Sequence, residues 1–214
     1  MKVFVVGANG KIGHHLVRLL ADDNQHVVKA MVRKDEQLRE MQKLGAEAAI
    51  VNLEGGVDQI AEGARGCDAI VFTAGSGGHT GADKTLLVDL DGAVKTIEAA
   101  EKSGIKRFIM ISALQAHRRE NWNEAIKPYY VAKHYADKML EQSSLTYTII
   151  RPGGLVDKTG TGKITIAEDI IEGAVPREDV AKTIIACLTE GNTYYRAFDL
   201  VSGDIPIAEA LKMF

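Results

Sequence analysis

The chain begins Met1-Lys2-Val3-Phe4-Val5-Val6-Gly7-Ala8-Asn9-Gly10-Lys11-Ile12-Gly13, a short apolar run that leads directly into three evenly spaced glycines. The apolar run predicts a buried strand, and a stretch with helical spacing follows the last glycine. Gly7 permits a tight turn, Gly10 lets the backbone approach a pyrophosphate, and Gly13 lets the helix pack closely on the sheet. Because the unpaired N–H groups at the start of that helix favour a phosphate, the stretch predicts a dinucleotide-binding turn. Its predicted cofactor-binding residues are Gly7, Asn9, Gly10, Lys11, Ile12 and Gly13.

Length and composition indicate an ordinary globular protein. A chain of 214 residues can bury one sizeable core, and no linker or repeat divides it, so we expect a single domain over residues 1–214. A formal net charge of −3 gives no general attraction to nucleic acid or to a membrane surface, so neither is expected as a partner. With no membrane-spanning stretch or signal peptide, we expect a cytoplasmic protein whose two cysteines, Cys67 and Cys187, stay reduced.

Apolar runs rich in Val, Ile and Phe alternate along the chain with longer stretches of helical spacing. The predicted strands are 2–6, 26–32, 47–51, 68–74, 106–112, 145–150 and 196–201. The predicted helices are 11–22, 35–44, 83–103, 129–143, 177–190 and 206–213. Strict alternation requires crossovers, which predicts an α/β doubly wound, mostly parallel sheet of about seven strands with helices on both faces, the Rossmann fold. The segment 153–175 is richer in glycine and polar residues, and we expect it to form a flap on the substrate side.

The end of the second predicted strand decides which dinucleotide binds. An acid at that point accepts hydrogen bonds from the ribose hydroxyls of NAD, whereas a basic residue suits the 2′-phosphate of NADP. Here the strand ends in Arg33 and Lys34, with no acid before Asp35. Because a guanidinium can form two parallel bonds with a phosphate, the sequence predicts NADP in preference to NAD. Two solvated cations at a strand end are the alternative.

Five further cofactor residues follow from the expected topology, because ligands of such sheets lie across the carboxyl ends of the strands. Asn52 and Leu53 come directly after the third predicted strand, and Thr73, Ala74 and Gly75 end the fourth. Small residues at 74 and 75 let the backbone come close to a ribose and its phosphates. We expect all five to lie along the adenosine half of the site.

Tyr129 and Lys133 stand four residues apart at the start of a predicted helix, so they share one face. An ammonium beside a phenol favours the phenolate and lowers the pKa of the tyrosine, which can then exchange a proton with a carbonyl or hydroxyl. Because the chain has six tyrosines and many lysines, a chance spacing is the alternative. The position of the pair in the chain favours the functional interpretation.

The stretch from Ala113 to Lys127 precedes this helix and carries several polar and aromatic side chains. It can line a substrate pocket or form a lid, with His117 as an auxiliary acid or base. A solvated surface segment anchored by Trp122 is the alternative. Six scattered histidines and two distant cysteines show no ligand spacing, so no metal site is predicted.

Together these motifs resemble the short-chain dehydrogenase/reductase superfamily over nearly the whole chain. The glycine spacing and the turn Arg151-Pro152-Gly153 look like its atypical and extended branches. The chain is similar to small bacterial proteins of the YhfK type, which are labelled NAD(P)-dependent epimerase/dehydratase-like. The resemblance implies that Tyr129 is the proton donor and that Lys133 binds the nicotinamide ribose and tunes Tyr129. It also implies that Pro152 and Gly153 flank the nicotinamide carboxamide.

The chain departs from the family pattern in two places. Active members carry a Ser or Thr just beyond the fifth strand, and the candidate catalytic residue here is Ser112. It lies one residue early, so that Ala113 takes the expected position. Extended members also have a sizeable C-terminal substrate domain, whereas only about sixty residues follow Arg151. The chain is therefore expected to provide few residues that could enclose a sugar-nucleotide substrate.

The resemblance implies an NADP(H)-binding oxidoreductase that transfers a hydride to or from a small carbonyl or alcohol substrate. One alternative is a non-catalytic NADP(H)-binding redox sensor, which Ala113 favours. Another is an NAD(P)-dependent epimerase or dehydratase. The intact pair of Tyr129 and Lys133 favours the oxidoreductase, because a sensor has no need of a tuned phenol. By analogy with the family, the long helices can also form a homodimer.

Overall fold

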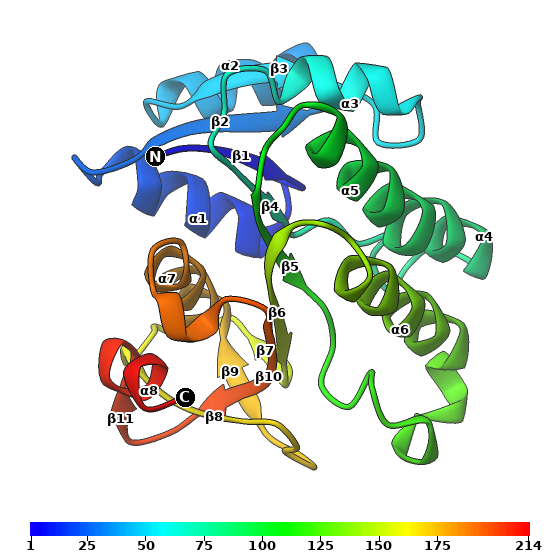
Figure 1. The fold of residues 1–214 in the computed structure, drawn as a ribbon, viewed down its shortest axis with the longest axis vertical. Helices are drawn as coiled ribbons and strands as arrows, with labels where there is room; N and C mark the ends of the chain where they lie inside the picture. Colours follow the sequence, from blue (N-terminus) through cyan, green and yellow to red (C-terminus); the bar gives the residue numbers. More distant parts are fainter.

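Every apolar run that the sequence predicts as a strand lies in one central sheet (Figure 1). The computed structural model describes residues 1–214. The parallel part of the sheet has the spatial order β3 (Glu47–Ile50), β2 (Val27–Val32), β1 (Lys2–Val6), β4 (Ala69–Phe72), β5 (Arg107–Ile111), β6 (Thr146–Pro152) and β10 (Arg196–Ser202). This is the strand order of a doubly wound dinucleotide-binding fold, so the predicted fold class is confirmed.

The sheet is wider than the sequence indicates, because two short antiparallel strands extend one edge. β8 (Lys163–Ala167) pairs with β10, and β11 (Ile205–Pro206) pairs with β8. β8 occupies the middle of the segment 153–175, which was expected to form a flap. The same segment holds β7 (Gly154–Val156), which pairs with β9 (Ala174–Pro176) in a separate two-stranded sheet. Strands this short do not stand out between glycine-rich turns in a sequence, since their pairing with distant residues is what forms them.

Helices cover both faces of the sheet. One face carries α1 (Lys11–Ala21), α2 (Asp35–Lys43), α7 (Arg177–Cys187) and α8 (Ile207–Met213). The other carries α3 (Val57–Gly63), α5 (Gly92–Lys102) and α6 (Lys127–Glu141). All predicted helices are present, and α3 is an addition too short to show a clear helical period. No helix combines the length and the apolar character that crossing a membrane requires.

The predicted helix 83–103 consists of three consecutive pieces. These are α4 (Ala82–Lys84), the π-helical stretch η1 (Thr85–Asp91) and α5. The π-helix is a rare form that occurs frequently at functional sites. The remaining short helices are 3₁₀ turns, namely η2 (Arg119–Asn121), η3 (Glu124–Ile126) and η4 (Gly191–Thr193).

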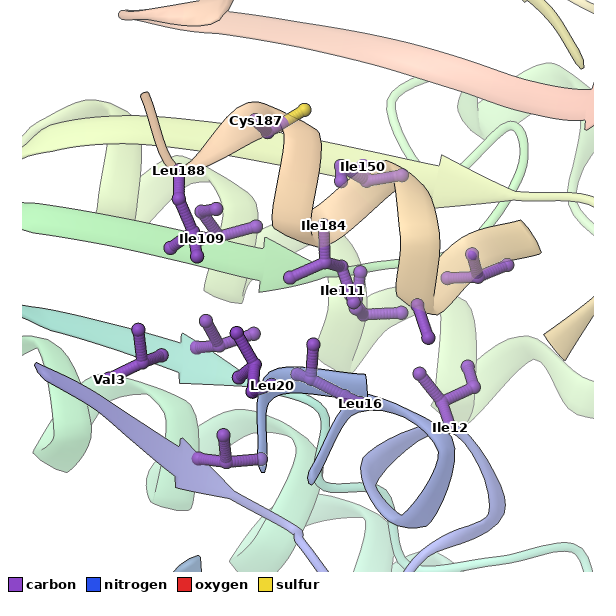
Figure 2. Packing of buried hydrophobic residues seen from close by; sticks show 14 of the residues in the cluster. Val3, Ile12, Leu16, Leu20, Ile109, Ile111, Ile150, Ile184, Cys187 and Leu188 are labelled. Atoms are coloured by element: carbon purple, nitrogen blue, oxygen red, sulfur yellow. The ribbon is translucent and has the colours of Figure 1, made fainter. Parts of the chain in front are cut away.

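Side chains that alternate along β1 divide the core into two layers. Val3 and Val5 point into the layer under α1 and α7, whereas Phe4 and Val6 point into the layer under α3, α5 and α6. All four side chains are fully buried. Figure 2 shows the first layer, with Leu16, Leu20, Ile109, Ile111, Ile150 and Ile184.

The topology places a crevice at the carboxyl ends of β1 and β4. From β1 the chain passes to β2 and β3 on one side, and through β4 it continues to β5 and β6 on the other. Ligands of open α/β sheets bind where the strand order reverses in this way. The fold therefore locates the candidate site at the edge where the glycine-rich turn follows β1.

Candidate active site

The glycine-rich turn after β1 has the shape that a bound dinucleotide requires. Gly7 has a φ of +85°, and a Cβ there would lie 2.6 Å from the backbone nitrogen of Ala74. A Cβ on Gly13 would clash with the carbonyl oxygen of Gly7, so α1 packs this closely only because residue 13 has no side chain. Gly10 is the N-cap of α1, with no side chain over the first helical N–H groups. The residues of this turn therefore fit a pyrophosphate.

A cavity of about 420 Å³ extends from this turn along the carboxyl ends of β1, β2, β3 and β4. The predicted cofactor residues that line it are Gly7, Asn9, Gly10, Arg33, Asn52, Leu53, Thr73, Ala74 and Gly75. Lys34 does not line it, because it is the exposed N-cap residue of α2. Gly13 lies outside the lining as well and serves the packing of α1.

A second cavity, of about 780 Å³, adjoins the first. The wall that the two cavities share consists of Gly10, Thr73, Ala74, Gly75, Ser76 and Thr80. Lys11 and Ile12 of the glycine-rich turn line the second cavity together with Ser112, Tyr129 and Lys133. The structure thus brings the three predicted catalytic side chains next to the predicted cofactor groove.

Tyr129 and Lys133 lie one turn apart at the start of α6. The ammonium nitrogen of Lys133 is 5.7 Å from the centre of the Tyr129 ring. Lys133 is only 4% exposed, and its ammonium donates a hydrogen bond to the carbonyl oxygen of Ile111 at 3.2 Å. A carboxylate that the sequence did not predict, that of Asp89 in η1, lies 3.4 Å from the same nitrogen.

The pKa of Tyr129 is not lowered in the way that the sequence predicts. Burial raises the pKa of Tyr129 above its ordinary value, and the Lys133 ammonium opposes this shift without reversing it. Burial acts to lower the pKa of Lys133, but the attraction of Tyr129 and Asp89 outweighs it and raises that pKa. The predicted lowering of the Tyr129 pKa is therefore outweighed in this structure. At neutral pH the site holds a phenol, which can donate a proton, beside an ammonium.

Ser112, rather than Ala113, faces the reaction cavity. Ser112 comes directly after β5 and lines the second cavity, whereas Ala113 does not. Its hydroxyl oxygen is buried and makes no close hydrogen bond, and the one carboxylate near it is that of Asp137. A buried hydroxyl without a partner on a cavity wall is a group that a ligand can satisfy. The structure thus turns Ser112 toward the cavity and Ala113 away from it, and the catalytic role of Ser112 stays a prediction.

The segment from Ala113 to Lys127 is anchored to the protein and reaches the second cavity only near its end. The indole N–H of Trp122 lies 3.2 Å from the carbonyl oxygens of both Gln115 and Ala116. Ala125 and Ile126, both in η3, line the second cavity. The segment therefore combines the anchoring by Trp122 with a small contribution to the pocket wall.

His117 lies outside both cavities, so it is not placed as an auxiliary acid or base. It lies instead near Asp169 and Asp199. The side-chain atoms of these three residues that could bind a metal ion all lie within 4.8 Å of one another. The side-chain amide of Gln115 donates to both carboxylates, at 2.6 Å to Asp169 and 3.5 Å to Asp199. Burial raises the pKa of Asp199 to about 6 and lowers the pKa of His117. The absence of a metal site stays a prediction.

Two cations that line the second cavity share one carboxylate. Lys11 begins α1, Arg177 begins α7, and their charged ends lie 2.5 Å and 2.7 Å from the carboxylate of Asp157. The hydrogen bond from Lys11 lowers the pKa of Asp157. The glycine motif marked Lys11, but nothing in the local sequence marked Arg177 or Asp157, which come from distant parts of the chain.

The turn after β6 lies outside both cavities. A Cβ on Gly153 would clash with the carbonyl oxygen of Gly173, so glycine is needed here for the close approach of these two chain segments. The predicted contact of Pro152 and Gly153 with a nicotinamide stays a prediction. The preceding residue, Arg151, is buried and donates from Nε to Asp137 at 2.9 Å. Asp137 stands four residues after Lys133 on the same face of α6, a spacing that could have marked it.

Comparison with known proteins agrees with this geometry. The sequence matches the family model described as NAD(P)H-binding over residues 7–191. The chain belongs to the NAD(P)H-binding family. This NAD(P)H-binding protein is 66% identical over 212 residues to the Bacillus subtilis (strain 168) protein named "Uncharacterized sugar epimerase YhfK", with 99% of each chain covered.

Two solved structures share the whole architecture of this NAD(P)H-binding protein. A putative NAD-dependent epimerase/dehydratase from Bacillus halodurans has a TM-score of 0.94 and 43% identity, with 100% of both chains covered. The oxidoreductase ylbE from Lactococcus lactis has a TM-score of 0.92 and 34% identity, with 100% of this chain and 96% of that chain covered. The family resemblance and the predicted nicotinamide cofactor class are confirmed.

Proposed function

We propose that the protein is an NADP(H)-dependent oxidoreductase that transfers a hydride to or from a small carbonyl or alcohol substrate. The observation that carries the proposal is that Ser112, Tyr129 and Lys133 line a cavity directly beside the glycine-rich turn. The oxidoreductase name of the Lactococcus lactis relative supports the same reaction class. A nicotinamide cofactor, when bound, supplies the hydride chemistry that the side chains of this site lack.

The first cavity supports a preference for NADP over NAD. Arg33 lines this cavity, is exposed, and forms no ion pair. Its guanidinium is therefore available for a 2′-phosphate, which it can bind through two parallel hydrogen bonds. The acid of the same cavity, Glu54, is already paired with Lys84 at 2.7 Å. Lys34 stands next in the chain and adds positive charge near the strand end.

The second cavity supplies the groups that a carbonyl reduction needs from a protein. The carbonyl oxygen gains negative charge as the reaction proceeds, and the phenol of Tyr129 can donate a proton to it. The hydroxyl of Ser112, whose one neighbouring side-chain acceptor is Asp137, can orient the same oxygen. The ammonium of Lys133 stabilises the phenolate that Tyr129 leaves behind, until a proton from solvent restores the phenol.

The walls of the second cavity fit a small and partly apolar substrate. Apolar side chains on its walls include Ile12, Ile126, Pro128 and Leu155. The segment after β6 adds only short strands beside the cavity and no further domain. Such a mixture of apolar walls with a few convergent polar groups is typical of small-molecule sites.

The proposal is tested by mixing the purified protein with NADPH and a panel of aldehydes, ketones, quinones and flavins, and following NADPH consumption. We expect at least one compound to be reduced, and turnover to fall by about 100-fold or more in Tyr129→Phe. Tyr130→Phe is the matched control, because Tyr130 stacks on Trp122 and lies outside the cavity lining. NADPH binding without turnover of any compound, or equal turnover in Tyr129→Phe, would contradict the proposal.

A further inference from the structure

Asp89 is a buried acid in the candidate active site to which the sequence assigned no role. It is only 1% exposed and lines the second cavity. One carboxylate oxygen, Oδ2, accepts a hydrogen bond from the backbone N–H of Ser76 at 2.9 Å. The other, Oδ1, accepts no hydrogen bond and lies 3.4 Å from the ammonium nitrogen of Lys133. One carboxylate therefore contacts both the loop after β4 and the lysine of the predicted catalytic pair.

This acid lies in the π-helical stretch η1. A π-helix has more residues per turn than an α-helix, since its hydrogen bonds join residues five apart. Thr85 and Asp89, four residues apart in η1, are both buried and both line the second cavity. The residues between them, Leu86 and Leu87, are exposed. This stretch therefore presents Thr85 and Asp89 to the cavity and leaves Leu86 and Leu87 outside.

The buried charges around Lys133 form two pairs. Asp137, one turn further along α6, receives the Nε hydrogen bond of Arg151 at 2.9 Å, and both side chains are buried. Asp89 is not paired with an arginine, and the cation that it contacts is the ammonium of Lys133. An unpaired charge in a protein interior is very costly, so each of these acids requires its partner. The ammonium of Lys133 is therefore balanced chiefly by Asp89.

We propose that Asp89 is a positioning residue, whose carboxylate balances the buried ammonium of Lys133 and so keeps Tyr129 a neutral phenol ready to donate its proton. The role of the phenol as a donor rests on the proposed function, whereas the charge balance does not. The same carboxylate holds the loop after β4 through Ser76, which links the wall of the cofactor groove to Lys133. In this arrangement Asp89 offsets part of the effect of the ammonium on Tyr129, so Lys133 stabilises the phenolate once the proton has been donated without forming it beforehand.

The direction of the expected effect follows from the charged groups that face Tyr129. Lys133 lowers the pKa of Tyr129, whereas Asp89, Tyr130 and Asp137 act with burial to raise it. Replacing Asp89 by asparagine removes one negative charge but keeps an oxygen that can accept the Ser76 N–H. The positive charge of Lys133 is then less compensated, so the pKa of Tyr129 should fall.

The test is a titration of the Tyr129 phenol by its ultraviolet absorbance. Subtracting the curve of each protein's own Tyr129→Phe version isolates Tyr129 from the other tyrosines. We expect Asp89→Asn to lower the pKa of Tyr129 by about 1 unit. The matched control is Asp91→Asn, because Asp91 is on the same helix but exposed and paired with Lys95 at 2.7 Å. An unchanged or raised Tyr129 pKa in Asp89→Asn, or an equal shift in Asp91→Asn, overturns the proposal.

Two further measurements separate this inference from the proposed function and from simple loss of folding. If the protein reduces a carbonyl, activity should be lost as Tyr129 ionises, so the alkaline limb of the pH profile should move to lower pH in Asp89→Asn. A protein without turnover refutes the proposed function but leaves the phenol titration decisive. If Asp89→Asn is unstable, the double variant Asp89→Asn/Lys133→Met, which removes both charges, should recover much of the lost thermal stability. Additive losses in the double variant would overturn the pairing.

Discussion

The two cavities of this protein are built in different ways. The first is shaped by backbone, because the critical positions, Gly7 and Gly13, are places where a Cβ would strike a neighbouring main chain. The second is lined by buried charged side chains, of which Asp89 and Lys133 come from two different helices. A backbone site needs residues of a given type at a fixed spacing, whereas a side-chain site needs partners that meet only after folding. The first should therefore fail through steric substitutions and the second through loss of charge.

The largest expected effect is behind the second cavity, at the buried pair of Asp137 and Arg151. Asp137→Ala leaves the buried Arg151 guanidinium with only the Glu141 carboxylate, 3.8 Å away, which should cost about 3–5 kcal/mol of unfolding free energy. Chemical denaturation measures this loss. The control is Lys138→Ala, since Lys138 is half-exposed and paired with Glu141 on the surface, and should change stability by less than about 1 kcal/mol. Similar losses in both variants would show that the buried pair does not hold this region.

Beside the first cavity, Gly13→Ala should lower stability by roughly 1–3 kcal/mol, because its Cβ would clash with the Gly7 carbonyl and force α1 away from the sheet. NADPH binding should weaken along with it, because the same shift opens the glycine-rich turn. Thermal unfolding and fluorescence titration with NADPH measure the two effects. Gly191→Ala is the control, since a Cβ at that position meets nothing within 4 Å. Unchanged NADPH affinity in Gly13→Ala would break the link between the shape of the turn and binding.

Arg33→Ala sharpens the comparison, because Arg33 is the one side chain of the first cavity to which we assign a specific electrostatic role. We expect NADPH affinity to fall by roughly 10- to 100-fold and NADH affinity to change little, since only NADPH carries the 2′-phosphate. Parallel titrations with both cofactors give the result. Arg39→Ala, at an exposed position of α2, should alter neither affinity. Equal losses for NADPH and NADH in Arg33→Ala would refute the phosphate assignment.

The smallest effect is expected at Asp157, which pairs with Lys11 and Arg177 at the edge of the second cavity. Asp157→Asn removes a negative charge beside two cations, so the affinity for NADPH should rise a few-fold at low salt. The gain should shrink as salt is added, because exposed charges are screened. A fall in NADPH affinity would mean that Asp157 holds the two cations in a useful geometry rather than competing for them.

The contrast between a site built from backbone and a site built from side chains also explains which parts of the structure could be predicted from the sequence. The strands and the cofactor turn were predictable because the apolar runs and the glycine spacing that form them are continuous stretches of sequence. The alternation of strands and helices along the chain indicates the topology. Strand β8 was missed because its pairing with β10 joins segments more than thirty residues apart. Helix α3 was missed because its seven residues form too few turns to show a period.

In the second cavity, only the part with a local spacing was predictable. Tyr129 and Lys133 share a helix face, and that spacing is visible in the sequence. Asp89 was hidden because an acid between apolar residues reads as the polar side of a surface helix, whereas the structure buries it against Lys133. Arg177 was hidden because a cation at a helix start has no motif. His117 looked like a functional residue by its chemistry, but the fold turns it away from the cavity.

The central claim is that one NADPH molecule spans both cavities, held by backbone in the first and acted upon by side chains in the second. A crystal structure of the NADPH complex tests this most directly. We predict the 2′-phosphate against the Arg33 guanidinium, the pyrophosphate over the glycine-rich turn, and the nicotinamide ring in the second cavity beside Tyr129 and Lys133. A nicotinamide ring outside the second cavity, or a 2′-phosphate that does not contact Arg33, would contradict the account.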